Sequence, residues 1–159
     1  MISTNTAIVT LPTDDQILIT REFDAPAHLV WRAVTEPDLV RQWWGAGHGE
    51  MTVCDIDLRV GGTWRYAQTT PDGQEVGFHG EYLELVQDER IVNTEIFDPF
   101  PDNGATTTMT LVEAGGRTTL TTLVQHGTAE ARDMHIASGM ESGMQASFDA
   151  LERVAVSLR

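Results

Sequence analysis

The chain has 159 residues and a formal net charge of −14, and its 10 basic residues are all arginines. A chain this acidic cannot neutralise phosphates, so its charge argues against binding to nucleic acid and to anionic membrane surfaces. The single cysteine, Cys54, excludes an internal disulfide. The length favours one core, and we expect a single domain over residues 1–159.

The N-terminal residues lack the basic segment and apolar core of a signal peptide. No apolar run approaches the ~20 residues that a membrane-spanning helix needs. We therefore expect a cytoplasmic protein that does not insert into a membrane and that is a monomer or a homodimer.

The first predicted elements are a hairpin and two short helices. Strands over residues 7–11 and 16–23 flank a turn at Pro12, and the second strand alternates between apolar and polar residues. Pro26 and Pro37 each open a short helix, because proline suits the first turn. The apolar residues of these helices lie within 29–34 and 39–44, and a glycine-rich stretch, Gly45-Ala-Gly47, ends the second.

The middle of the chain predicts six strands joined by tight turns. Glycine pairs at 61–62 and 115–116 and the Pro-Asp-Gly stretch at 71–73 mark three of these turns. The expected strands cover residues 52–58, 63–68, 75–86, 91–97, 106–112 and 118–125. Consecutive strands with such short connections predict an antiparallel sheet and an α+β fold.

Residues 129–158 predict one long helix, because apolar residues recur three or four positions apart. Such a helix would be about 40 Å long and would cross the whole domain. Its first half carries Met134, Met140 and Met144 beside Gly139 and Gly143. Flexible thioethers next to bare backbone can line a space of variable shape, although a closely packed core is the alternative.

Nine short segments in order resemble a known family. They include Phe23-Asp-Ala-Pro26, Arg41-Gln-Trp43-Trp44-Gly45, Gly61-Gly62-Thr-Trp64-Arg65 and Gly139-Met140-Glu-Ser-Gly143. Together they resemble the bacterial relatives of the activator of Hsp90 ATPase, within the START-like, Bet v 1-like (SRPBCC) superfamily. The resemblance implies a helix-grip fold: a curved antiparallel sheet wrapped around a long C-terminal helix, with two short helices after the first long strand and a cavity in between.

The sequence gives little support for catalysis or for a bound cofactor. The five histidines, among them His48, show no metal-ligand spacing, and Cys54 has no partner nearby. Asp55 and Asp57 share one face of a strand, which we interpret as exposed. We therefore predict no metal site, no cofactor and no catalytic residue.

The aromatic and methionine residues are the stronger candidates for a site. Large aromatic side chains rarely face water, and an enclosed apolar space with a few polar tips is typical of a small-molecule pocket. The predicted ligand-binding residues are Trp44, Trp64, Tyr66, Phe78, Tyr82, Phe97, Met109, Met134, Met140, Gly143 and Met144.

The sequence leaves three functions open. The first is binding of a small apolar or aromatic molecule, without covalent chemistry. The second is an enzyme of the polyketide cyclase/aromatase kind, in which His79, Tyr66 or Tyr82 would move protons. The third is an interaction module of the co-chaperone type, which would need an exposed apolar patch.

Overall fold

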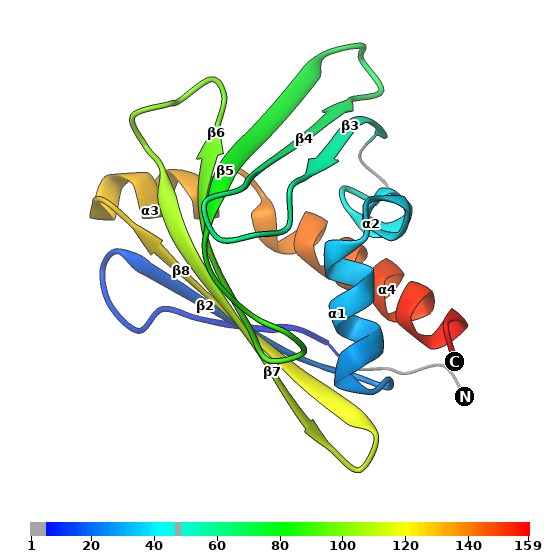
Figure 1. The fold of residues 1–159 in the computed structure, drawn as a ribbon. Coiled ribbons are helices and arrows are strands. Elements are labelled where there is room, and N and C mark those ends of the chain that lie inside the picture. The colour runs from blue at the N-terminus through cyan, green and yellow to red at the C-terminus, as the bar shows by residue number, and fades with distance from the viewer. Residues whose placement is uncertain (1–5, 47–48) are drawn as a thin grey trace.

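The computed structural model describes residues 6–46 and 49–159 (Figure 1). Gly47 and His48, both named above, lie outside these ranges. The elements are β1 (Ile8–Thr10), β2 (Gln16–Phe23), α1 (Ala27–Thr35), α2 (Pro37–Trp43), β3 (Glu50–Ile56), β4 (Thr63–Thr69), β5 (Glu75–Val86), β6 (Arg90–Phe97), β7 (Ala105–Ala114), β8 (Arg117–His126), α3 (Ala129–Ala137) and α4 (Met140–Ser157).

The strands form one antiparallel sheet of eight strands in the order β1-β2-β8-β7-β6-β5-β4-β3. β2 pairs with β8 along its whole length, from Gln16 opposite Gln125 to Phe23 opposite Thr118. The sheet curves, and α1, α2 and α4 gather on one side of it (Figure 1). The predicted α+β helix-grip fold is therefore confirmed.

The strand pattern in the sequence explains how the sheet buries one face. In β2 the side chains of Ile17, Ile19, Arg21 and Phe23 are buried, while the residues between them are partly or fully exposed. Successive residues of a strand point to opposite faces, so this period of two places one set of side chains toward the helices. The same alternation determines which strand residues line the cavity.

The predicted single C-terminal helix is wrong, because the chain forms two helices with a break at Ser138 and Gly139. Gly139 has φ +82°, a left-handed conformation that ends a regular helix. Among the residues of α3 only Ala131 is buried, so little tertiary packing supports a continuous helix against the low helix propensity of glycine. Thr128 caps the start of α3 by accepting a hydrogen bond from the Ala131 N–H at 3.0 Å.

The C-terminal half of α4 holds this helix against the rest of the fold. Phe148, Leu151, Val154 and Ala155 are buried, and the Phe148 ring meets the edge of the Phe23 ring at 5.8 Å between centroids. These are the large apolar residues that the helical period places on one face.

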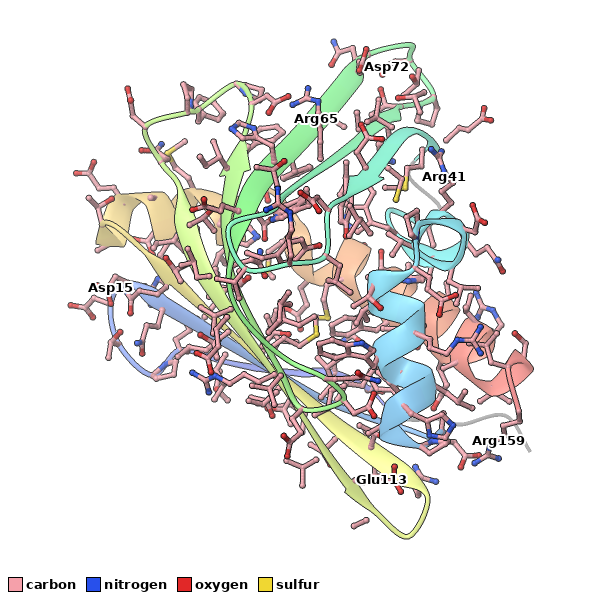
Figure 2. All side chains as sticks on the ribbon, viewed as in Figure 1. Asp15, Arg41, Arg65, Asp72, Glu113 and Arg159 are labelled. Atoms are coloured by element: carbon pink, nitrogen blue, oxygen red, sulfur yellow. The ribbon has the colours of Figure 1, made fainter. Side chains whose placement is uncertain are left out.

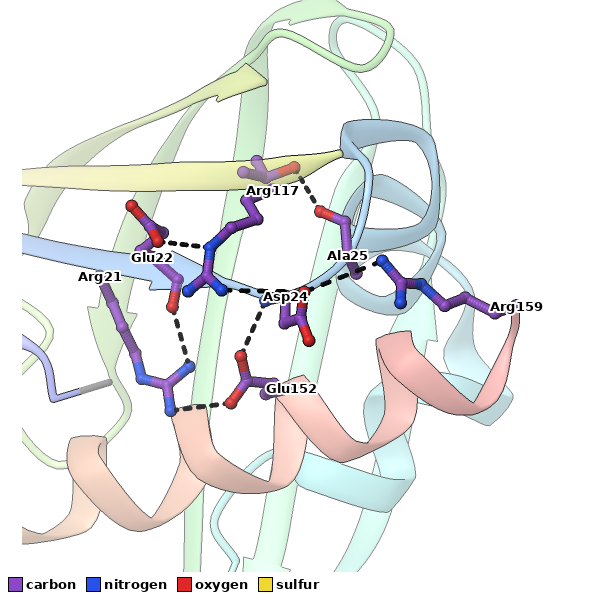
Figure 3. A network of polar contacts seen from close by, with 8 residues as sticks. Arg21, Glu22, Asp24, Ala25, Arg117, Glu152 and Arg159 are labelled. Atoms are coloured by element: carbon purple, nitrogen blue, oxygen red, sulfur yellow. Dashed lines mark hydrogen bonds and ion pairs between the residues drawn. The ribbon is translucent and has the colours of Figure 1, made fainter. Parts of the chain in front are cut away.

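A buried polar network joins the same part of α4 to the end of β2 (Figure 3). The Arg21 guanidinium donates to Asp149 at 2.8 Å and lies 3.5 Å from the Glu152 carboxylate. The other Glu152 oxygen accepts a hydrogen bond from the Asp24 N–H at 2.8 Å. Arg21 also lies over the Phe23 ring, 4.6 Å from its centroid.

Candidate functional site

Two adjoining lobes of a half-open candidate cavity lie between the curved sheet and the helices. The aromatic lobe has a volume of about 410 Å³ and is lined mainly by β4, β5, β6, the end of α2 and α4. The α3 lobe has a volume of about 480 Å³ and extends toward α3 and the β6–β7 connection. Seven residues line both lobes, so the two form one continuous region.

Aromatic rings make up one wall of the aromatic lobe. Trp64 and Tyr66 on β4 and Phe78 on β5 all face this lobe, together with Trp44 just after α2. The Trp44 ring meets the Tyr66 and Phe78 rings edge-on, at 5.4 and 5.5 Å between centroids. Such mutual contacts fix the rings against one another, so this wall is preformed.

The first turns of α4 form the opposite wall. Met140, Gly143, Met144 and Ser147 line the aromatic lobe, at the spacing of three and four residues that marks one face of a helix. Gly143 brings only backbone to this face. It therefore contributes no side chain to the space between α4 and the sheet.

The structure brings the eleven predicted residues to the two lobes. Nine line the aromatic lobe: Trp44, Trp64, Tyr66, Phe78, Tyr82, Met109, Met140, Gly143 and Met144. Phe97 and Met134 line the α3 lobe instead. Met134 is 49% exposed, because the break at Gly139 ends the helical face on which the sequence pattern had placed it.

Polar side chains interrupt the apolar lining near the junction of the lobes. Glu95 on β6 and Gln68 on β4 line both lobes. The Gln68 amide nitrogen is buried without a hydrogen-bond partner among the described residues. Asn93 and Thr107, in contrast, satisfy each other through a hydrogen bond of 3.0 Å.

Burial shifts the pKa of several groups in this wall. It raises the pKa of the Tyr66 and Tyr82 hydroxyls and of the Glu95 carboxyl, because the charged forms lose water. Burial, with a smaller contribution from His126, lowers the pKa of His135 to about 4. At neutral pH both tyrosines keep their protons and His135 is neutral.

Two histidines connect α3 to the last strand. His126 Nε2 and His135 Nδ1 lie 3.0 Å apart, at hydrogen-bonding distance, and both residues line the α3 lobe. Burial also lowers the pKa of His126. The pair is therefore a neutral contact between α3 and β8, and not a pair of cations.

His79, a candidate proton carrier in the enzyme hypothesis, does not line either lobe. It follows Phe78 on β5 and so points to the opposite face of the sheet. Its Nδ1 lies 2.7 Å from the Asp98 carboxylate, and Asp98 also accepts a hydrogen bond from Arg65 at 2.6 Å. His79 belongs to this outer polar cluster.

Glu95, Gln68 and His126 are polar or charged wall residues that we did not predict, and other lining residues such as Asn93 and His135 were not predicted either. The odd or even positions of the first three within their strands could have predicted that they point inward. Glu95 has the parity of Ile91 and Phe97, Gln68 that of Trp64 and Tyr66, and His126 that of Leu120 and Val124. A polar residue at an inward position of an otherwise apolar strand face indicates that this face borders a cavity and not a fully packed core.

The described residues contain no group of three or more histidine, cysteine, aspartate or glutamate side chains placed to hold a metal ion. No helix in the described part of the chain is long and apolar enough to span a membrane.

Known structures share this fold. A protein of Rhodobacter sphaeroides is 26% identical and superposes with a TM-score of 0.88 over 95% of this chain and 99% of that one. A protein of Mycobacterium smegmatis is 26% identical, with a TM-score of 0.83 over 94% of this chain and 96% of that one. A protein of the dynemicin biosynthetic locus, DynU16, is 22% identical and has a TM-score of 0.67 over 89% of this chain and 47% of DynU16, which shows the fold alone.

No curated protein matches the chain. The model of the family described as activator of Hsp90 ATPase homolog 1-like protein matches residues 24–155, most of the chain. The chain therefore belongs to the family of activator of Hsp90 ATPase homolog 1-like proteins, within the Bet v 1-like helix-grip folds.

Proposed function

We propose that the protein binds a small apolar or aromatic molecule in the cavity between its sheet and α4. The main support is the open space between the aromatic wall and the Gly143 face of α4. A space of about 410 Å³ lies within the range of small-molecule pockets. Its lining combines rings and thioethers with a few polar groups, as such pockets commonly do.

The energetics of the lining support the same proposal. Apolar surface that faces a water-filled space loses the stabilisation of burial, about 25 cal/mol for each Å². A ligand that fills the aromatic lobe would recover part of that free energy without any rearrangement of the wall, because the rings already contact one another.

A substitution at Gly143 tests the proposal directly. In Gly143→Leu an isobutyl group is added on the face of α4 that lines both lobes. The matched control is Ser142→Leu, which adds a similar bulk one residue earlier at an exposed position. The probe is prodan, an uncharged naphthalene fluorophore whose emission reports on the polarity around it, titrated into the full chain.

We expect saturable one-site binding of prodan to the wild type and to Ser142→Leu, and its loss in Gly143→Leu. Far-UV circular dichroism checks that both variants fold. Gly143→Leu should be no less helical than the wild type, because leucine has the higher helix propensity. A flat response of the wild type, or equal binding by both variants, would contradict the proposal and leave the interaction module as the remaining function.

A second candidate function is proton transfer within the same cavity, as in a cyclase-like enzyme. The observation that favours it is the presence of titratable groups in the wall. A general acid or base works best with a pKa near the working pH. Burial moves the pKa of Tyr66, Tyr82 and His135 away from neutrality but raises that of Glu95 toward it.

Glu95 is thus the group to test for catalysis. Benzoylacetone, an aromatic diketone, exchanges the hydrogens between its carbonyls with deuterium oxide when a base removes a proton. Enzymatic function predicts exchange that the wild type accelerates and Glu95→Gln does not. Binding without acceleration would leave the protein as a carrier.

A further inference from the structure

Glu95 is the acidic side chain in the cavity wall, and it faces the junction of the two lobes. Within the described residues, no hydrogen bond or ion pair reaches its carboxyl group. Asn93, two residues earlier on the same face of β6, is by contrast satisfied by Thr107. Glu95 is half-buried; a partly buried carboxyl group without a partner costs free energy on folding, and a ligand can supply the missing partner.

The cavity wall offers no arginine or lysine among the residues that the structure describes. None of the arginines in the described chain lines either lobe, and Arg41 and Arg159 lie at the periphery of the molecule (Figure 2). Arg21, which is buried between β2 and α4, is paired with Asp149 and Glu152. A negatively charged ligand would therefore lose its water without gaining a counter-ion, against a net protein charge of −14.

The aromatic wall is compatible with a cation. Trp44, Trp64, Tyr66 and Phe78 line the lobe that Glu95 adjoins. The faces of such rings carry partial negative charge and attract ammonium groups. The same wall accommodates the aromatic part of a ligand by stacking or by edge contacts.

We propose that the cavity selects aromatic molecules that carry a protonated amine, and that Glu95 pairs with the ammonium group. This inference rests on the proposed function, because it names the class of ligand for the same cavity. Glu95 is half-buried, so folding has already removed part of the water from its surroundings. Binding then adds mainly the desolvation of the amine, and a charge-assisted hydrogen bond offsets it.

The pairing requires an ionised Glu95. Burial raises the pKa of this carboxyl group, so it keeps its proton to a higher pH than an exposed glutamate does. An ammonium ligand displaces that proton. Amine binding should therefore release protons and tighten as the pH rises through the pKa of Glu95, whereas binding of a neutral ligand should do neither.

Three indole compounds with similar rings and different charges test the proposal: tryptamine is a cation, tryptophol is neutral and indoleacetate is an anion. Isothermal titration calorimetry of the full chain at neutral pH should rank their affinities in that order. We expect tryptamine to bind roughly tenfold or more tighter than tryptophol, the range of one hydrogen bond to a charged group. In Glu95→Gln the advantage of tryptamine should disappear while tryptophol binding is kept.

The matched control is Glu81→Gln. Glu81 lies on the adjacent strand β5 and is exposed, so this variant changes the net charge equally without changing the cavity wall. Tryptamine should bind it as it binds the wild type. If Glu81→Gln weakens tryptamine as much as Glu95→Gln does, the preference comes from overall charge and the proposed role of Glu95 is wrong.

The outcomes separate this inference from the function on which it rests. If prodan binds but tryptamine has no advantage over tryptophol in the wild type, the inference fails and ligand binding stands. If neither prodan nor any indole binds, the proposed function itself fails. Should Glu95→Gln not fold, titrations of the wild type with both ligands at a series of pH values from 4 to 7 still decide. An affinity for tryptamine that rises with pH while the affinity for tryptophol stays constant supports the inference, and a ratio of the two affinities that does not change with pH overturns it.

Discussion

The buried contact between Arg21 and Glu152 gives a quantitative prediction about what holds α4 against the sheet. Glu152→Ala removes the acceptor of the Asp24 N–H bond at 2.8 Å and one of the two carboxylates near Arg21. Removing one partner of a buried ion pair destabilises a protein by about 3–5 kcal/mol. Because Arg21 keeps Asp149 at 2.8 Å, we expect the lower end, about 3 kcal/mol.

Asp149→Ala is the matched comparison, since it removes the other carboxylate from the same helix. The Asp149 side chain is 53% exposed, whereas that of Glu152 is 8% exposed. Exposed pairs contribute about 0.2–1 kcal/mol, so Asp149→Ala should cost less than Glu152→Ala although its contact with Arg21 is the shorter.

Urea unfolding followed by circular dichroism measures both free energies of unfolding. For a chain of this size about 1 kcal/mol corresponds to 2–4 °C in Tm, so thermal scans give an independent check. Equal losses for the two variants, or a larger loss for Asp149→Ala, would refute the argument that burial and the Asp24 bond decide the contribution of each carboxylate.

Three further predictions concern other parts of the fold. Gly139→Ala should destabilise the protein by about 1 kcal/mol in urea unfolding, because a residue with a side chain disfavours a φ of +82°. The cost comes from the backbone alone, since nothing lies within 4 Å of the added Cβ. The control is Gly127→Ala, at a glycine without a positive φ. Lowering the pH from 6.5 to 4 should cost roughly 3 kcal/mol of stability through His135. The pKa of this histidine is about 6.5 in the unfolded chain and about 4 in the folded protein, so over this range only the unfolded state gains the proton. His135→Gln should flatten the measured dependence of the unfolding free energy on pH in the same range. Trp43→Phe should destabilise by about 1–3 kcal/mol, because it removes the buried hydrogen bond of 2.8 Å from the indole N–H to the Ala33 carbonyl; an unchanged urea midpoint would contradict this.

The strands were predictable because their signals are local. The predicted bounds of β2 and β5, 16–23 and 75–86, match the structure. The glycine turns predicted the hairpins between β3 and β4 and between β7 and β8, but no local signal gave the pairing of β2 with β8. The C-terminal helix was mispredicted at Gly139, where the helical spacing of apolar residues continues but the backbone does not. The decisive quantity there is the burial of α3, which depends on contacts far away in the sequence.

The cavity wall was predictable only in part. Aromatic and methionine residues stand out in the sequence, and the structure places Trp44, Tyr66 and Met144 around one lobe. Glu95 does not stand out, since an acidic residue in a strand usually faces water. The alternation along β6 does predict that Glu95 points toward the helices. Whether such a residue meets a packed core or an open space depends on the distance between sheet and helix, and the sequence pattern does not give that distance.

The break at Gly139 divides the C-terminal region into two helices that are held to the rest of the fold to different degrees. α4 is held by buried apolar residues and by the Arg21 network, whereas α3 is mostly exposed. Displacing α3 therefore needs less free energy than displacing α4. Under the proposed function, a ligand would enter and leave past α3 while α4 and the strands keep most of the cavity wall in place, so substitutions in α3 should change its residence time more than its Kd.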